Sequence, residues 1–374
     1  MQPVEYIERI TCEKVAESVM GDGALRFAYE TALGRTLWPV LFGSKAVSAL
    51  MGAYYDSRLS KGAIRALAAI PGCRADEAEK PLDAYRSFND FFTRRLKPGA
   101  RPLGELFVSP ADGRLRLYLD AAADAPFPLK GATKTLRAVC GGDLPAGAPD
   151  GARFDIAVIR LAPVDYHRFH FPYDCAKAAP TQVIPGDYHS VNPIALVRRP
   201  DVYADNERHV TRYDTVFGNM WIIEVGAFGV GTIVQTAPEP PGDKYQLLHR
   251  KGDEKGYFKF GGSTVILVTE AGKVKYDKDL VRHSSNGYEV RVFCGERIAR
   301  PVFQRRVSAA PSDLTSAEAS SPASAAAASA AASGPASSPP ASAAASGPAS
   351  SPPAQAGVSI PASGQPAAAD AHPA

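Results

Sequence analysis

Three stretches of the chain place reactive side chains in turn-rich surroundings. SPADG contains Asp112 between a proline and a glycine, and FGGST contains Ser263. The third stretch, DYHRFH, contains His167 and His170. An Asp, a His and a Ser far apart in a sequence can converge into a relay, in which the carboxylate orients the imidazole and the imidazole takes the hydroxyl proton. Nucleophilic chemistry at Ser263 is therefore one hypothesis.

Each of these residues also has a purely structural interpretation. Asp112 before a glycine and after a proline fits ordinary turn chemistry, and Ser263 can hydrogen-bond a bulge. His167 and His170 share one side of a helix or lie on opposite faces of a strand, depending on the element that forms. Two histidines without a further Cys or His neighbour make a weak metal site, so we expect no metal. Taken alone, these residues leave the alternatives open.

The glycines before Ser263 raise a separate question. Val265 begins the apolar run VILV, which is typical of a buried strand, whereas Gly261 and Gly262 weaken a strand because they lose backbone entropy and pack no side chain. One explanation is a bulge or a tight bend. Another is that the backbone itself reacts between Gly262 and Ser263, where small residues admit an attacking hydroxyl.

Composition divides the 374 residues into an ordinary globular part and an unusual tail. Residues 1–306 contain all 42 basic and 36 of the 39 acidic residues, a net charge of +6 against +3 for the whole chain. This mild excess suits an anionic membrane surface or an acidic substrate. Without a basic stripe or an aromatic platform it does not predict nucleic-acid binding.

Cysteine usage and the N-terminal sequence indicate a reducing compartment. The five cysteines are widely spaced and form no CxxC pair, so neither a disulfide framework nor a structural zinc site is predicted. The N-terminal sequence MQPVEYIERITCEK has acidic residues where a signal peptide has a basic region, so export is not expected. No window of about 18 apolar residues predicts a membrane-spanning helix.

The N-terminal part of the chain has the pattern of basic, amphipathic helices. Within residues 24–70, apolar side chains such as Leu50 and Met51 recur at helical spacing, and Arg58, Lys61 and Arg65 share one face of the next segment. Such helices either lie in a membrane interface or pack on a protein core. The sequence leaves both possibilities open.

From about residue 105 to 300 the pattern changes to short strands separated by Gly and Pro turns. The clearest runs are FDIAVIRL, NMWIIEV, GVGTIVQT, STVILVTE and YEVRVFC. The fold class expected is α+β, with N-terminal amphipathic helices followed by a mostly antiparallel β core. The tail, residues 307–374, contains ASGPASSPPA twice and is expected to be disordered, because it buries too little apolar surface to offset its ordering entropy.

Taken together and in order, the motifs resemble the phosphatidylserine decarboxylase family. They are SFNDFFTRRLKPGARP, SPADG, LAPVDYHRFHFP, SVNP, NERH, EVGAFGVGTI and KGYFKFGGSTV, and they cover roughly residues 60–300. The family often has LGST where this chain has GGST, which keeps the Gly–Ser bond. It usually has NERV where this chain has NERH, so that His209 is a departure from the pattern.

The resemblance implies a precursor that cuts its own backbone between Gly262 and Ser263. In this family Ser263 would become an N-terminal pyruvoyl group, the covalent pyruvate cofactor, which forms a Schiff base with phosphatidylserine and releases CO2 to give phosphatidylethanolamine. The resemblance gives Asp112 and His170 the relay that deprotonates Ser263. It makes His167 a candidate for assisting decarboxylation or protonating the product carbon.

The resemblance also implies partners, location and domains. The cleaved β chain (1–262) and α chain (263–374) would stay together as a heterodimer, in a further homo-oligomer, bound peripherally to anionic lipid on the cytoplasmic side of a bacterial inner membrane. The expected domains are a helical, membrane-associating region (1–75), a catalytic core (76–306) and the tail (307–374).

Three other functions compete with this one. A decarboxylase of another serine-headgroup lipid is possible because the sequence does not show the acyl-chain site. A Ser-His-Asp lipid or ester hydrolase would use Ser263 intact, although GGST lacks the GxSxG elbow. An inactive, membrane-bound interaction protein is disfavoured by the joint presence of Asp112, His170 and Ser263.

Overall fold

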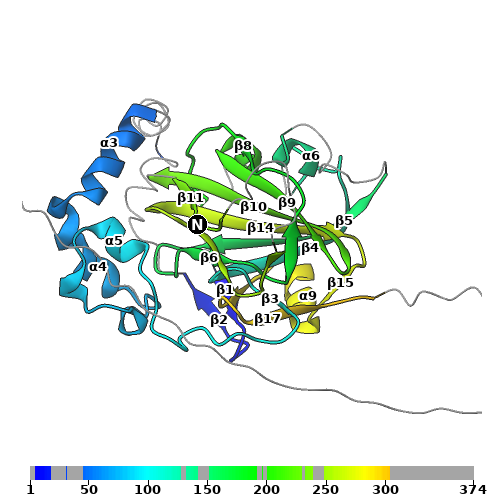
Figure 1. Cartoon of the computed structure of the whole chain (residues 1–374), viewed down its shortest axis with the longest axis horizontal. Coiled ribbons are helices and arrows are strands. Elements are labelled where there is room, and N and C mark those ends of the chain that lie inside the picture. The colour runs from blue at the N-terminus through cyan, green and yellow to red at the C-terminus, as the bar shows by residue number, and fades with distance from the viewer. Residues whose placement is uncertain are drawn as a thin grey trace, which may run out of the picture. The chain divides into compact units, whose positions relative to one another are not determined.

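A computed structural model describes residues 5–17, 31, 45–127, 132–141, 151–191, 196, 200–229, 232–238 and 248–303 (Figure 1). The tail that was expected to be disordered lies outside the described residues. So do most of residues 24–44, the first half of the segment that was predicted as helical.

The core is one large sheet in which all neighbours except β1 and β16 run antiparallel. The strand order is β12-β7-β9-β10-β14-β5-β4-β16-β1-β2, and β8 also pairs with β9. The strands are β1 (Glu5–Glu8), β2 (Lys14–Ala16), β4 (Gly113–Ala122), β5 (Arg153–Leu161), β7 (Cys175–Lys177), β8 (Gln182–Ile184), β9 (Arg208–Thr215), β10 (Gly218–Gly229), β12 (Leu248–His249), β14 (Gly261–Glu270) and β16 (Glu289–Val292).

Two small antiparallel sheets accompany the main sheet. The first consists of β11 (Ile233–Gln235), β13 (Glu254–Phe258) and β6 (Arg168–His170), and β13 is its central strand. The second consists of β15 (Val274–Tyr276), β17 (Arg297–Pro301) and β3 (Phe107–Val108). The first of these sheets contains the DYHRFH motif and therefore positions candidate site residues.

The helices are short. The longer ones are α3 (Lys45–Asp56), α4 (Ala63–Ala68) and α9 (Lys278–Ser285), with α5 (Phe88–Phe92), α6 (Leu136–Val139) and α8 (Val202–Asp205) of one turn each. Three 3₁₀ turns, η1 (Arg58–Gly62), η2 (Ala75–Glu77) and η3 (Leu82–Ala84), connect the N-terminal helices. No helix in the described part of the chain is long and apolar enough to cross a membrane.

The expected α+β class with a mostly antiparallel core is confirmed. The region expected to be helical also contains two strands at its N-terminal end. Strands β1 and β2 lie within residues 1–75. Tyr6 and Ile7 are buried, and β1 pairs in parallel with β16 near the other end of the described chain. A contact between such distant segments leaves no local pattern to recognise.

The central strand β14 is buried on both faces. Val265 and Leu267 belong to one apolar cluster, and Ile266 and Val268 belong to a second cluster on the opposite face. This two-sided burial explains why the run VILV is continuous rather than alternating. The strand is therefore held in the middle of the core.

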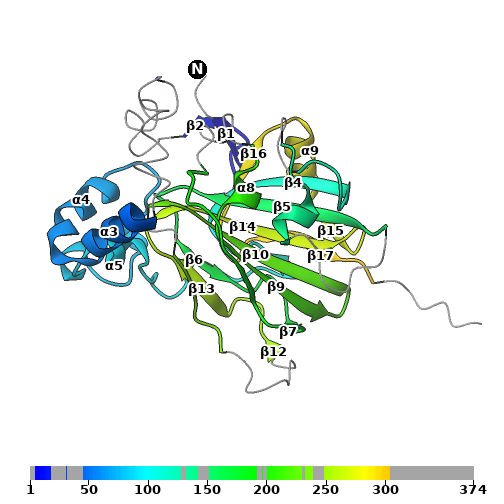
Figure 2. The same cartoon turned by 90° about the horizontal axis from the view of Figure 1, so that it is seen from above.

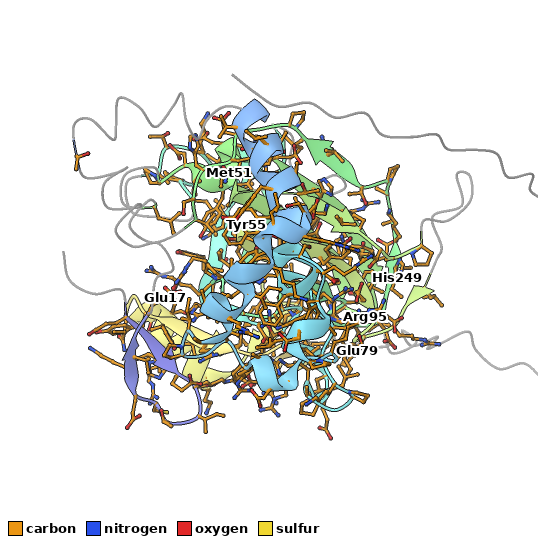
Figure 3. The ribbon with its side chains drawn as sticks, turned by 90° about the vertical axis from the view of Figure 1, so that its left-hand side faces the viewer. Glu17, Met51, Tyr55, Glu79, Arg95 and His249 are labelled. Carbon is orange, nitrogen blue, oxygen red and sulfur yellow. The ribbon has the colours of Figure 1, made fainter. Side chains whose placement is uncertain are left out.

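The N-terminal helices divide between core packing and exposure. Ile64 and Leu67 of α4 are buried with the aromatic residues of α5 in a third cluster, whereas Leu50 of α3 is 73% exposed and Leu59 of η1 is 83% exposed. Figure 1 shows these helices beside one end of β10 and β14, and Figure 3 shows Met51 and Tyr55 along α3. The interpretation as helices packed on the core therefore fits α4, and the interpretation as an exposed, membrane-binding surface fits α3 and η1.

This division predicts that two leucine substitutions change the stability by very different amounts. Leu67→Ala is expected to lower the free energy of unfolding by about 2–5 kcal/mol, because it leaves a cavity in the third cluster. Leu50→Ala is expected to change it by less than about 0.5 kcal/mol, because the side chain is already exposed. Urea unfolding followed by circular dichroism measures both, and equal effects would contradict the assignment.

Candidate active site

Ser263 lies in the middle of the main sheet. It pairs with Gly226 of β10 on one side and with Leu161 of β5 on the other. The residue is fully buried, and its Oγ has no hydrogen-bond partner among the described residues. A buried hydroxyl without a partner loses its hydrogen bonds to water and gains none in return. Ser263 therefore has no evident structural use for its hydroxyl.

Strand pairing is irregular at the residue before Ser263. Gly229 and Gly226 of β10 pair with Gly261 and Ser263, so β10 has one extra residue opposite Gly262. The pairing of β5 with β14 reaches only to Ser263. The bulge that the sequence suggested is therefore present, but on the neighbouring strand. The two glycines do not interrupt β14, which begins at Gly261.

Ser263 shares a face of the sheet with Val265 and, on β5, with Leu161; we call this the inner face. The small sheet β11-β13-β6 covers it. Phe169 and Phe258, on β6 and β13, belong to the same apolar cluster as Val265 and Leu161. Figure 2 shows β6 and β13 beside β10. The DYHRFH motif is thereby brought next to the inner face.

His167 lies on the side of the small sheet that faces Ser263. It precedes β6 and its carbonyl oxygen accepts a hydrogen bond from the backbone N–H of Phe258, which places it on the same side as Phe169, two residues on. The imidazole is fully buried and its centroid lies 3.9 Å from that of the Phe92 ring. His167 is thus the histidine of the motif that shares a face with the serine.

The hydrogen bonds of His167 fix which nitrogen is basic. Its Nδ1 lies 3.0 Å from the carbonyl oxygen of Asp165, an acceptor, so Nδ1 carries the proton. Its Nε2 then holds a lone pair and has no partner among the described residues. Burial lowers the pKa of His167 to about 3. The imidazole is therefore neutral near pH 7, and Nε2 is its unprotonated nitrogen.

His170 points the other way. Its Nδ1 donates to the carbonyl oxygen of Gly252 at 3.0 Å, and the hydroxyl of Tyr166 donates to its Nε2 at 3.2 Å. The ring lines a cavity of about 760 Å³ that Arg101 also lines. Burial lowers the pKa of His170. The two histidines thus take opposite faces, as a strand requires, and in this structure His170 does not share the face of Ser263.

Asp112 is buried beside the same cavity and is held by an arginine. Its two carboxylate oxygens accept from Arg101 at 2.8 and 2.5 Å, and one also accepts from the backbone N–H of Cys294 at 2.8 Å. The backbone N–H of His170 donates to the carbonyl oxygen of Pro110. The structure therefore brings SPADG and β6 together, but the carboxylate of Asp112 bonds to Arg101 rather than to His170.

The glycine of SPADG has a packing reason. A Cβ at Gly113 would lie 2.7 Å from the carbonyl oxygen of Arg160, closer than real Cβ atoms approach. Only glycine allows β4 and β5 to come this close. Gly113 thus fixes the turn that presents Asp112.

Sequence reasoning did not single out Asp165, which organises the loop between β5 and β6. Its carboxylate pairs with Arg114 and accepts from the backbone N–H of Ala162, while its carbonyl oxygen holds His167. A second arginine, Arg160, pairs with Glu17 in the same buried region. The position of Asp165 in DYHRFH was the only available signal. Among the described residues, no group of three or more His, Cys, Asp or Glu is arranged to hold a metal.

The burial of His167 predicts a pH dependence of stability. Its pKa is about 3 when folded, against 6.5 for an ordinary histidine, so between these values the unfolded chain binds more protons and acid favours unfolding. Between pH 7.5 and 5.5 this one group should cost about 1.4 kcal/mol of unfolding free energy. We expect His167→Gln, in a Ser263→Ala background, to remove that loss in urea titrations at the two pH values. An equal loss in both chains would contradict the assignment.

Known proteins of one family are similar to this chain over most of its length. The family model for phosphatidylserine decarboxylase matches residues 88–300. A phosphatidylserine decarboxylase proenzyme of Ruminiclostridium cellulolyticum is 36% identical over 306 residues, which are 81% of this chain and 99% of that protein. Proenzymes of the same name from Clostridium botulinum (strain Alaska E43) and Chlamydia pneumoniae are each 38% identical over 305 residues, 80% of this chain and 100% and 98% of theirs. The chain belongs to the phosphatidylserine decarboxylase family.

Proposed function

We propose that this chain is a phosphatidylserine decarboxylase proenzyme that cuts its own backbone between Gly262 and Ser263. The observation that carries the proposal is the buried Oγ of Ser263, which has no partner and follows the one residue of β14 that lies opposite a bulge. Thr264 and Thr269 of β14 also have buried hydroxyls without a hydrogen-bond partner among the described residues, but neither follows the position opposite the bulge. Family membership supplies the reaction class.

The bond changes of the cut balance without another reactant except water. The Oγ of Ser263 attacks the carbonyl carbon of Gly262, the C–N bond breaks, and the proton of the hydroxyl ends on the freed amine. Elimination across Cα–Cβ of Ser263 then releases the carboxylate of Gly262 and leaves dehydroalanine. Hydrolysis gives a pyruvoyl group and ammonia. That group supplies the electron sink that decarboxylation of an amino acid needs.

The sheet supports the retention of both chains after the cut. Thr264 to Glu270 pair with β5 on one side, and Thr264 to Thr269 pair with β10 on the other. Both neighbouring strands belong to the β chain, and β14 beyond Ser263 belongs to the α chain. The new N-terminus therefore stays in the core through backbone hydrogen bonds and burial on two faces. A heterodimer of the two cleaved chains is proposed on this ground, and a further homo-oligomer remains a prediction.

The two histidines receive different tasks in the proposal. The ammonium group of a serine headgroup must lose a proton before its nitrogen can bond to a carbonyl carbon. His167 can accept it, because its Nε2 has a lone pair and its side of β6 faces position 263. Asp112 and His170 keep the relay predicted from the motif. To act on Ser263, however, the ring of His170 must leave Tyr166 and Gly252.

The proposal predicts a decarboxylase that loses its activity with Ser263. Purified protein mixed with phosphatidylserine vesicles is expected to release CO2 and form phosphatidylethanolamine, and phenylhydrazine should block it by reacting with the ketone. Ser263→Ala should be inactive, and His170→Asn should stay uncut if the relay is right. His167→Asn should be cut but turn over roughly 10²-fold more slowly or worse. Phosphatidylserine hydrolysis by an uncut wild-type chain would instead support the hydrolase.

The exposed part of the N-terminal helices supports a peripheral membrane surface. Leu50 and Leu59 are exposed large apolar residues, and Lys61 and Arg65 are exposed nearby. Apolar side chains that enter the acyl boundary and cations near lipid phosphates are the two parts of interfacial binding. The substrate headgroup lies in that interface. We propose that this surface binds anionic lipid, on the cytoplasmic side of a bacterial inner membrane.

Two aspartates placed on this surface should separate membrane binding from folding. Leu50→Asp with Leu59→Asp is expected to release the protein from vesicles containing phosphatidylserine in a flotation assay. Its self-cleavage and unfolding curve should stay as in the wild type, because neither leucine is buried. Leu248→Asp, at an exposed leucine on β12, is the matched control. Unchanged flotation of the double variant would refute the surface.

A further inference from the structure

A second buried ionic cluster lies on the inner face, apart from the residues already described. The carboxylate of Glu224 on β10 lies 2.7 Å from Nζ of Lys255 on β13, and neither side chain is more than 1% exposed. Gln235 of β11 closes a triangle with them. Its Nε2 donates to the other oxygen of Glu224, and its Oε1 accepts from Lys255, each at 2.9 Å. The cluster is thus fixed by three mutual contacts.

The register places Glu224 next to Ser263. Glu224 pairs with Val265, so Ser263, two residues along β14, is its diagonal neighbour on the inner face. Diagonal neighbours in an antiparallel pair have Cβ atoms about 7 Å apart, a gap that a long side chain spans. The carboxylate of Glu224 can therefore reach a group attached to residue 263.

Stability does not explain why these charges are buried. Removing two charges from water costs several kcal/mol each, and replacing a buried ion pair by apolar residues is often neutral or stabilising. Nζ of Lys255 also lies over the rings of Phe169 and Tyr213, 5.7 and 6.0 Å from their centroids, and these cation–π contacts offset only part of the desolvation cost. All members of the cluster precede Ser263, so it does not hold the two cleaved chains together. A role in the reaction remains.

The reaction needs a proton donor at this place. Converting an α-ammonium carboxylate into an ammonium and CO2 consumes one proton, which must reach the α carbon inside the core. His167 starts without a proton to give, because its one N–H is held by Asp165 and its Nε2 carries a lone pair. The proton that it accepts from the substrate ammonium is needed again when the product leaves as an ammonium, so the α carbon needs a second source. Lys255 carries an ammonium group, and its partner Glu224 reaches toward residue 263.

We propose that Glu224 and Lys255 together supply the proton that decarboxylation consumes; this rests on the proposed function. The bond between the α carbon and the carboxylate carbon breaks, CO2 leaves, and the electron pair forms a new C–H bond with a proton from Glu224. Lys255 transfers its proton to Glu224 and regains one from solvent. Glu224 is then a catalytic residue, and Lys255 acts through it.

His209 on β9, which departs from the family's NERV motif, lies beside the cluster. His209 pairs with Glu224 in the β9–β10 ladder, and its Nδ1 accepts a hydrogen bond from Nε2 of Gln235 at 3.2 Å. It is partly exposed. The cluster therefore has a titratable residue between it and solvent, on the side from which a proton can return.

Two variants of similar shape test the proposal, and Lys255→Arg also keeps the charge balance of the core. Glu224→Gln keeps the shape and the contact to Lys255 but cannot transfer a proton. Lys255→Arg keeps the ion pair, but a guanidinium does not give up its proton in proteins. The matched control is Lys177→Arg. Lys177 is also a buried lysine, and its row of the sheet passes through Tyr213 and Met220 to Thr269, six residues from Ser263.

Each variant is compared with the wild type in self-cleavage, turnover, KM and the identity of the α-chain N-terminus. Both should be cut normally, and kcat should fall roughly 10²-fold at unchanged KM. When protonation of the substrate α carbon is slow, a proton can add instead to the carbon that was Cα of Ser263. Hydrolysis then leaves an N-terminal alanine, which mass spectrometry detects. Accumulation of this alanine per turnover should rise in both variants and not in Lys177→Arg.

Wild-type kcat and no added alanine in cut Glu224→Gln would overturn the proposal and assign proton delivery to His167. Failure of both variants to self-cleave would also overturn it, because the pair would then act before decarboxylation. These outcomes are distinct from failure of the proposed function itself. In that case the wild-type chain would stay uncut.

Discussion

The proposed function places one constraint on the structure: Ser263 is a core residue and must also be the residue that reacts. Its backbone pairs on two sides with β10 and β5, and in the proposed function this pairing would hold the new N-terminus in place after the cut. The ladder between β10 and β14 is interrupted at the residue before Ser263 by the bulge in β10, and the proposed cut falls at that residue. A central strand with a single irregular position meets both demands, which an exposed loop could not, because a cut loop separates from the core.

The small sheet over the inner face determines which side chains face position 263. Strand alternation sends His167 toward Ser263 and His170 toward the cavity beside Asp112. The covering sheet also excludes water, which leaves His167 neutral and allows the Glu224–Lys255 pair to persist as a strong interaction. The residues proposed for self-cleavage, proton acceptance and proton supply thus lie on different segments around one buried residue.

Much of this fold follows from local pattern. The runs around β5, β10, β14 and β16 predict these strands, because apolar β-branched residues are enriched in buried strands. Strands β1 and β2 are not predicted, since β1 pairs with β16 near the other end of the described chain and β2 pairs with β1. The motifs identify Asp112, His167, His170 and Ser263 as candidates, but not their faces, which depend on β6 being a strand. Glu224 and Lys255 lie in different segments and become neighbours only through the register of two sheets.

The most direct test of the account is the intact-mass spectrum of the purified protein beside that of Ser263→Ala. The account predicts two wild-type chains that end at Gly262 and begin at residue 263, the smaller one blocked by a pyruvoyl group, and a single mutant chain. A single uncut wild-type chain, or a cut at another bond, would contradict it, because position 263 would then carry no electron sink.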